Sequence, residues 1–403
     1  MRFFDKGELK LLWPFYLDAL LSPILFFMPA FMVVYFFGIG LSATQMSILL
    51  AIWPATSLIF EIPTGAFADI YGRKASVLTG YFLEGLAVLS LFFWDNYYLM
   101  LASFAFLGFA ATFSSGSKEA WIADLIKKKN SNLMHNYFSK SMAFDSFALI
   151  LSGFLGAFLV RQFGISIMWI VAFFSFLVSI CILLFAKEYF TARKIKLRES
   201  FNELKTQTII SLKYSYKHHV LFYFMIAGFI AAFSLSFQTT ISWTPLLKEF
   251  GMKDYQFGYL WSVMSAVLML APLFAMKFLK KGKEKNFIIF GMAVSTLITA
   301  LVVFAFNLPS VIGIMLIAMF FYFSKSPAQR VYFHRFIPSK LRATVGSVES
   351  MLLAVASIIA LPFAGILIDK IGARYTIFFS AVIMIPAIIF YLKIKENKSQ
   401  SCK

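Results

Sequence analysis

Twelve long apolar stretches limit what this chain can fold into more than any other feature. A bilayer core about 30 Å thick needs about 20 apolar residues to cross it as a helix. Stretches of this kind lie at 11–37, 44–68, 74–94, 98–123, 138–161, 165–186, 220–246, 255–276, 286–306, 310–334, 343–368 and 374–393. A membrane barrel would instead show short segments of alternating hydrophobicity. The pattern predicts an all-α membrane protein with 12 transmembrane helices.

The composition agrees with a membrane protein. Hydrophobic residues make up 60% of the chain and charged residues 14%, against about 25% charged in soluble domains. The first apolar stretch is longer than a signal-peptide core, and no small-residue cleavage site follows it before Gly38, so we expect it to be retained. The two cysteines, Cys181 and Cys402, predict no disulfide.

The net charge of +18 follows from topology and does not indicate nucleic-acid binding. If both termini are cytoplasmic, 30 of the 37 Lys and Arg residues fall on the cytoplasmic side. This is the positive-inside bias that orients helices during insertion. We therefore predict a multi-pass protein of the inner or plasma membrane, with both termini in the cytoplasm and no nucleic-acid partner.

A polar, basic interruption separates six apolar stretches from the next six. The predicted organisation is an N-terminal six-helix bundle, a cytoplasmic linker, a C-terminal six-helix bundle and a cytoplasmic tail, at 1–186, 187–219, 220–394 and 395–403. Apolar residues at helical spacing predict an amphipathic helix at 197–212, and a mobile tether is the alternative for the rest of the linker.

The two halves carry a weak internal repeat. The fifth stretch ends in Gly153-Phe154-Leu155-Gly156 and then Arg161 to Gly164, and the eleventh ends in Ala364-Gly365 and then Asp369-Lys370-Ile371-Gly372. Two six-helix halves with matching landmarks are typical of alternating-access transporters, whose substrate site lies between the halves near the middle of the membrane.

A short polar motif, Gly65 to Lys74, joins the second and third stretches. Gly65 permits close helix contact, and Gly72 permits a tight turn. Asp69 can accept hydrogen bonds from a helix N-terminus or pair with a base, and Arg73 and Lys74 can anchor the loop in the cytoplasm. The alternative is an ordinary loop, which also favours glycine, one acid and several bases.

With this motif the chain resembles the major facilitator superfamily over nearly its full length. Residues 40–45, 60–65 and 326–344 are similar to passages of the bacterial drug-exporter-like branches. The resemblance implies that Asp69 and Arg73 belong to a charge cluster that locks the cytoplasmic side in the outward-facing state. The chain departs from the antiporter pattern at Ser152-Gly153, where those branches have Gly-Pro, and no helix-four arginine is evident.

Charged side chains inside the apolar stretches are candidates for function, because each costs about 2.5–3.5 kcal/mol at the bilayer centre. A carboxyl group without water favours its neutral form, so it could bind a proton that a transporter exchanges for substrate. The proton-coupling candidates are Asp18, Asp145, Glu349 and Glu84. The alternative is structural pairing. The predicted gate network near the membrane boundary comprises Glu61, Glu119, Asp124, Arg330 and Arg342.

Other side chains are candidates for substrate binding. Lys118 and Lys325 lie in polar stretches at similar places in the two halves, and two ammonium groups could hold an anionic substrate. Alternatively, Lys118 pairs with Glu119 or Asp145, and Lys325 snorkels. An amphipathic ligand could contact Phe233, Phe237, Gln238 and Trp243, although in a chain with 51 Phe residues simple packing is a strong alternative.

Several function classes find no support in the sequence. The four histidines lack metal-ligand spacing, no nucleophile–histidine constellation lies in the stretches, and there is no phosphate-binding glycine loop. We expect no enzyme and no cofactor other than a coupling proton or, alternatively, Na⁺. The prediction is a monomeric proton-coupled exporter of small amphipathic or lipophilic compounds. The alternatives are a permease for a small anionic metabolite and, remotely, a non-transporting membrane receptor.

Overall fold

The structure is a computed structural model that describes residues 4–5, 7–129, 133–190, 206, 209–210, 213–338 and 341–394. All regular elements in these residues are helices. Those of the first half are α1 (Glu8–Leu25), α2 (Met28–Gly38), α3 (Ala43–Tyr71), α4 (Arg73–Phe93), α5 (Tyr97–Ser114), α6 (Ser117–Lys129), α7 (Leu133–Phe163) and α8 (Ile167–Leu184). Those of the second half are α10 (His219–Ser236), α11 (Thr240–Glu249), α12 (Gln256–Phe278), α13 (Glu284–Ala300), a 3₁₀ turn η1 (Leu301–Phe304), α14 (Leu308–Ser324), α15 (Ser326–Arg335) and α16 (Arg342–Lys393).

The helices confirm the predicted all-α membrane fold. Eleven helical segments of the described chain are long and apolar enough to cross a membrane, and the last of these, Thr344–Lys393, has 50 residues. Inside α16, Gly372 has φ 84° and ψ 162°, so two helices meet there. The stretches predicted at 343–368 and 374–393 both lie in α16, and the count of 12 stays a prediction.

Four predicted stretches are each divided into two helices: 11–37, 98–123, 220–246 and 310–334. Gly116, with φ 68°, lies between α5 and α6. Proline occurs in the first turn of α2 and of α15, where its missing N–H has no partner in any case. These breaks matter for function, because discontinuous membrane helices expose polar groups at mid-membrane depth.

Contacts divide the chain into two compact units. The first comprises Met1–Ile39, Ile52–Ser200 and Lys253–Ser265, and the second comprises Gly40–Ala51, Phe201–Met252 and Ala266–Lys403. Helices α3 and α12 each contribute residues to both units. The predicted domain boundaries stay predictions. The tail at 395–403 lies outside the described residues, as does the predicted helix at 197–212 apart from residues 206, 209 and 210.

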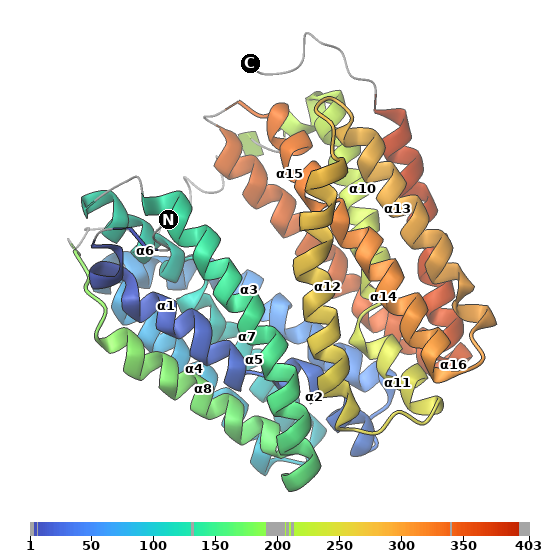
Figure 1. Cartoon of the computed structure of the whole chain (residues 1–403), viewed down its shortest axis with the longest axis horizontal. Coiled ribbons are helices and arrows are strands. Elements are labelled where there is room, and N and C mark those ends of the chain that lie inside the picture. The colour runs from blue at the N-terminus through green and yellow to red at the C-terminus, as the bar shows by residue number, and fades with distance from the viewer. Residues whose placement is uncertain are drawn as a thin grey trace. The chain divides into compact units, whose positions relative to one another are not determined.

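In the first unit, α1 lies beside α7 and α8, and α4 lies beside α5 and α8 (Figure 1). The fully buried rings of Phe15, Trp121 and Tyr137 fill the space where α1, α6 and α7 approach one another. Glycine permits close packing at the contact of α3 with α5. A Cβ at Gly108 would lie 2.4 Å from the backbone oxygen of Trp53.

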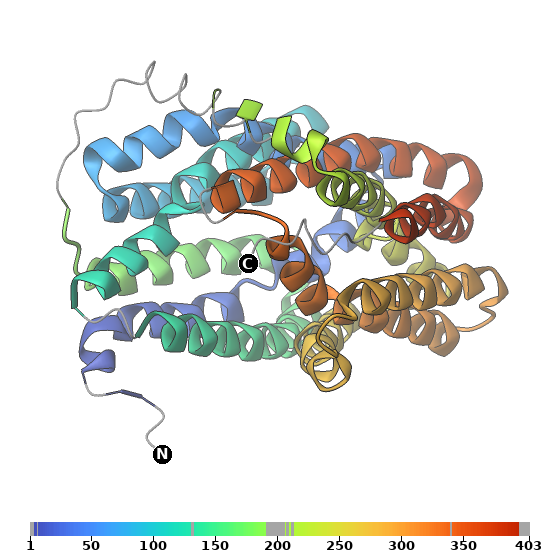
Figure 2. The same cartoon turned by 90° about the horizontal axis from the view of Figure 1, so that it is seen from above.

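In the second unit, α10 packs along α16, and α13 packs against α14 and α16 (Figure 2). Serine hydroxyls bond to backbone oxygens across these contacts: Ser234 to Ser380 O at 2.7 Å and Ser295 to Ala318 O at 2.8 Å. Such bonds hold helices together where the surrounding lipid supplies no hydrophobic driving force.

The same contacts recur in the two halves. Arg73, the first residue of α4, pairs with Asp124 of α6, and Glu284, the first residue of α13, pairs with Arg335 of α15 across the same 51 positions. The next residue in each helix also repeats a contact: Lys74 donates to the backbone oxygens of Leu184 and Ala186 around the end of α8. Lys285 donates in the same way to those of Leu392 and Ile394 around the end of α16. The two halves therefore share this pattern of contacts, with the charges of the ion pair reversed.

Candidate functional site

A buried ion pair in the first unit joins two of the predicted site residues. The Nζ of Lys118 lies 2.5 Å from Oδ2 of Asp18, whose side chain is 1% exposed. Asp18 belongs to α1, and Lys118 is the second residue of α6, directly after the break at Gly116. The pair therefore sits where the divided helix α5–α6 approaches α1.

The second oxygen of Asp18 is also bonded. It accepts from the Ser22 hydroxyl at 2.7 Å, and the Ser22 and Ser179 hydroxyls are 2.5 Å apart. This chain of polar groups links α6, α1 and α8 through an otherwise apolar bundle. Because both carboxylate oxygens have partners, the position of Asp18 is fixed on two sides.

Two tyrosines border the ion pair. The Tyr81 side chain of α4 interacts with Lys118, whose ammonium lies 5.8 Å from the centre of the Tyr81 ring. Tyr137 of α7 interacts electrostatically with both members of the pair. Sequence reasoning missed both residues, since nothing distinguishes them among 17 tyrosines.

Two further predicted carboxyl groups lie within electrostatic reach of Lys118. Asp145 of α7 is half-buried and interacts with Lys118 and Asp18, but makes no hydrogen bond or ion pair with any described residue. Glu84 of α4 is 9% exposed, accepts a hydrogen bond from Ser114 at 2.8 Å and also interacts electrostatically with Lys118. Three of the four proton-coupling candidates thus gather around one ammonium group.

The second unit brings Lys325 and Glu349 into electrostatic contact. Lys325 is 4% exposed, donates to Gln329 at 2.8 Å and lies 4.2 Å from the Tyr322 ring centre. Glu349 also interacts with Arg330. Lys118 and Lys325 are not equivalent in the repeat, because Lys118 lies inside α6 whereas Lys325 precedes α15.

The predicted aromatic contacts lie around the break between α10 and α11. Phe237 is buried against Ala360 and Ala364 of α16, with Phe233 beside it. Trp243 is also buried, and the Gln238 side chain accepts from Thr299 at 3.4 Å. Phe233 and Phe237 therefore contribute to packing in the second unit, which is the alternative that the sequence left open.

The motif between α3 and α4 forms a tight polar turn. Gly72 has φ 101°, a conformation that side chains disfavour, and a Cβ there would lie 3.0 Å from Glu188 Oε2. The backbone N–H of Lys74 donates to Glu188 at 3.0 Å, so an acid near the N-terminus of α4 complements the helix dipole. Glu188 was missed because only the fold brings it to this turn.

Arg73 bonds to α6 rather than to Asp69. It donates to the Ala120 oxygen at 2.5 Å and to the Asp124 carboxylate. Among the described residues Asp69 has no hydrogen-bond or ion-pair partner, and Gly65 is exposed. A pocket of about 170 Å³ lies at this turn, lined among others by Asp69, Arg73, Asp124 and Glu188.

The side chains of the other predicted gate residues make no hydrogen bond or ion pair with any described residue. Glu61, Glu119, Arg330 and Arg342 are all exposed. Of the predicted gate network, only Asp124 has an ion-pair partner among the described residues, and this partner is Arg73 of the motif. No group of three or more residues suited to holding a metal ion occurs in the described part of the chain.

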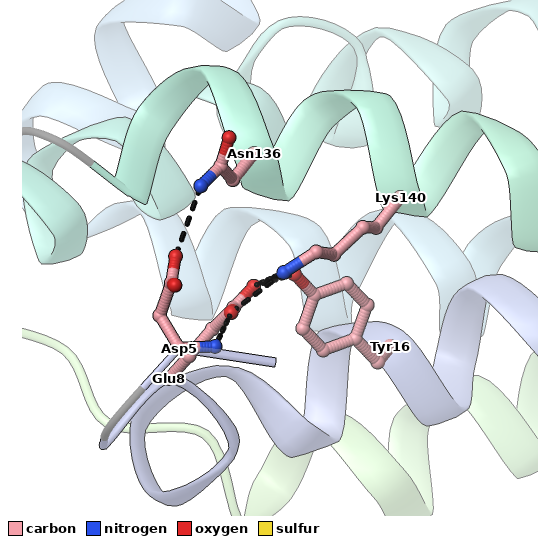
Figure 3. Close-up of polar contacts among 5 residues, drawn as sticks. All are labelled: Asp5, Glu8, Tyr16, Asn136 and Lys140. Carbon is pink, nitrogen blue, oxygen red and sulfur yellow. Dashed lines mark hydrogen bonds and ion pairs between the residues drawn. The ribbon is translucent and has the colours of Figure 1, made fainter. Parts of the chain in front are cut away.

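A second buried ion pair joins the N-terminal end of α1 to α7 (Figure 3). Glu8, 0% exposed, pairs with Lys140 of α7 at 2.7 Å, and also accepts from the Tyr16 hydroxyl and from the Asp5 backbone. Asn136 donates to the Asp5 carboxylate at 2.9 Å. The cluster ties α1 to α7, the two helices that carry Asp18 and Asp145, and so stabilises their relative position.

Similar sequences are found among transporters. A sequence profile described as Major Facilitator Superfamily matches residues 15–360. The uncharacterized MFS-type transporter YxaM of Bacillus subtilis (strain 168) is 24% identical over 371 residues, which are 88% of this chain and 88% of that protein. The uncharacterized MFS-type transporter MJ1560 of Methanocaldococcus jannaschii is 21% identical over 266 residues, 62% of this chain and 68% of the relative.

Solved transporter structures share the fold. The nucleoside transporter NupG matches with a TM-score of 0.75 at 11% identity, over 95% of this chain and 99% of that chain. A POT family transporter in complex with 5-aminolevulinic acid matches with a TM-score of 0.71 at 16% identity, over 94% of both chains. At these identities the likeness shows the fold and does not reveal the substrate.

Proposed function

The chain belongs to the major facilitator superfamily, whose members are secondary transporters, and from this membership we propose that it is a proton-coupled exporter of small amphipathic or lipophilic compounds. Its work would be alternating access, in which a substrate site is exposed to one side of the membrane at a time. The proposal goes beyond family membership in three respects: the coupling ion, the direction and the class of substrate.

One observation carries the proposal. Asp145 lies within electrostatic reach of the buried Asp18–Lys118 pair and makes no hydrogen bond of its own with a described residue. A carboxylate in an apolar bundle is stabilised by an opposite charge or is neutralised by a proton. Asp145 could therefore hold either a proton or the cationic group of a substrate. Mutually exclusive binding of this kind is what antiport requires.

The neighbouring groups have supporting roles in this proposal. Both oxygens of Asp18 are already bonded, so we assign Asp18 to positioning Lys118 rather than to carrying the proton. Lys118 then supplies a fixed positive charge near Asp145, which favours release of the proton once substrate is available. Glu84, bonded to Ser114, is the further acid of this cluster.

The experiment uses purified protein in liposomes that contain a pH-sensitive dye, challenged with lipophilic cations, neutral drugs and organic anions. We expect protons to leave the lumen as a cationic compound enters it. Asp145→Asn should abolish this coupling. Asp95→Asn is the matched control, since Asp95 lies in the exposed turn between α4 and α5 and should retain full coupling. Unaltered coupling in Asp145→Asn would contradict the proposal.

A second candidate function is a permease for a small anionic metabolite. Lys325 favours it, because this buried ammonium hydrogen-bonds to the uncharged Gln329 and interacts with Glu349 only electrostatically, without an ion pair to any described residue. An anionic substrate could then pair with Lys325. A response to anions alone, with protons moving in the same direction and lost in Lys325→Gln, would support the permease. Dependence on a sodium gradient instead would indicate Na⁺ as the coupling ion.

We also propose a monomer in the plasma membrane with both termini in the cytoplasm. Light scattering of the detergent-solubilised protein tests the monomer. For orientation, Cys402 in the tail can be labelled with an impermeant maleimide in a Cys181→Ser background. Labelling of intact cells would contradict the assignment, whereas labelling that requires permeabilised cells would support it.

A further inference from the structure

The first turn of α3 is held by a carboxylate from another helix. Asp369 of α16 accepts from the backbone N–H groups of Ala43 and Thr44, both at 2.9 Å, and from the Thr44 hydroxyl at 2.6 Å. Ala43 and Thr44 are the first two residues of α3, whose N–H groups have no partner within the helix. A negative charge there also complements the positive end of the helix dipole.

One helical turn before Asp369, α16 packs closely against α3. A Cβ at Gly365, one turn before Asp369, would lie 2.2 Å from the Ser47 hydroxyl and 2.6 Å from the Ala43 oxygen. Ser47 is fully buried by this contact. Asp369 itself is exposed, so water can take over its hydrogen bonds if the helices separate.

The contact has a counterpart between α7 and α12. A Cβ at Gly258 would lie 2.7 Å from the backbone nitrogen of Ala157, and Arg161, one turn further along α7, lies over the Tyr255 ring at 5.4 Å. Both joints thus combine a close crossing of small residues with a charged side chain four positions later. The charge is an anion on a helix N-terminus in one joint and a cation on an aromatic ring in the other.

Asp369 also repeats the pattern of the motif loop. It precedes Gly372, with φ 84° and ψ 162°, by three residues, just as Asp69 precedes Gly72, with φ 101° and ψ 152°. Helix α3 therefore has such an aspartate at each end. Asp69 lies near its last residue, about 39 Å from Ala43 at 1.5 Å per residue.

From these contacts we propose that Asp369 and the first turn of α3 form a releasable latch. The latch closes the transport pathway on the side of the membrane opposite the Gly65–Lys74 motif, and each transport cycle breaks and reforms it. Contacts group residues 43–51 of α3 with α16 and the rest of the helix with the first unit. A transport cycle can separate α3 from α16 by breaking these polar bonds and the close contact of Gly365 with Ser47, without disturbing the core that holds residues from 52 onward.

The test measures the accessibility of both ends of α3 to a maleimide in protein reconstituted in nanodiscs, so it needs no substrate. In a Cys181→Ser, Cys402→Ser background, Ser47→Cys reports on the latch and Gly65→Cys on the motif end, where a Cβ meets nothing within 4 Å. Asp369→Asn should accelerate labelling at position 47 at least about fivefold and slow it at position 65. Lys370→Gln, the neighbouring charge, is the control and should change neither rate.

The opposite direction of the two changes is decisive. Loss of folding would accelerate labelling at both positions. That result would show that Asp369 is only a structural cap, and it would overturn the proposed latch. Equal rates in Asp369→Asn and Lys370→Gln would also overturn the proposal. If Asp369→Asn does not fold, Thr44→Val removes one donor and leaves every charge in place, and it should shift both reporters in the same directions by a smaller factor.

Discussion

Lys118 and Asp18 lie 100 positions apart in sequence, and their side chains meet at 2.5 Å in the interior of the first unit. The pair joins a helix that begins after a break to the first helix of the chain. Asp18 is almost fully enclosed, whereas the Lys118 side chain is 28% exposed. Removal of Lys118 and removal of Asp18 should therefore differ in their effect on stability.

Lys118→Met should destabilise the protein by about 3 kcal/mol, because it leaves the buried Asp18 carboxylate without its charge partner. The double variant Lys118→Met, Asp18→Asn should recover most of this loss, since no uncompensated charge remains. Lys127→Met, at an exposed position of the same helix, is the control and should be neutral. Thermal unfolding in detergent measures all three, and additive losses in the double variant would contradict the coupling.

Gly153→Ala should destabilise the contact of α7 with α12 by about 1–3 kcal/mol. An added methyl group would lie 2.2 Å from the Ser262 hydroxyl and 2.3 Å from the backbone oxygen of Gly258, and the backbone cannot yield easily. At Gly313 of α14 a Cβ meets nothing within 4 Å, so Gly313→Ala should be neutral or stabilising by up to about 1 kcal/mol. Equal melting temperatures for the two variants would refute the close crossing.

Glu284 and Arg335 should tolerate an exchange of their charges. Glu284 is 3% exposed and bonded to Arg335, so Arg335→Asp alone should cost about 3 kcal/mol and lower expression. Adding Glu284→Arg should restore most of the stability, because Arg73 and Asp124 occupy the equivalent positions with that polarity. Melting temperatures of the single and double variants measure the effect, and failure of the double variant to recover would show that the two sites are not equivalent.

Much of the fold follows from the sequence. Each predicted stretch contains helix, and the motif lies at the turn between α3 and α4, because length, hydropathy and glycine placement are local properties. The breaks within four stretches were missed. Helical periodicity marks no interruption in these stretches, although Pro29, Gly116 and Pro327 lie where helices begin or end.

The candidate site could be predicted only in part. An acid or base within an apolar stretch is visible in the sequence, and Asp18, Asp145, Glu84 and Lys118 do come together. Which base meets which acid depends on helix rotation and crossing, which the sequence does not reveal. One of the two interpretations of Lys118 paired it with Glu119 or Asp145, and its ion-pair partner is Asp18. Glu188 and Asp369 act on helices that are remote in sequence, so the sequence does not reveal which helix each of them contacts.

The opposite polarity of the two ion pairs also bears on how the chain assembles. Two halves with the same contacts could in principle exchange helices during insertion, with α4 docking on α15 and α13 on α6. Such a mispaired intermediate would place Arg73 beside Arg335, and Glu284 beside Asp124. Like charges brought together in this way repel, and the penalty rises as water leaves. The opposite polarity of the two ion pairs thus favours docking of each helix on the partner from its own half.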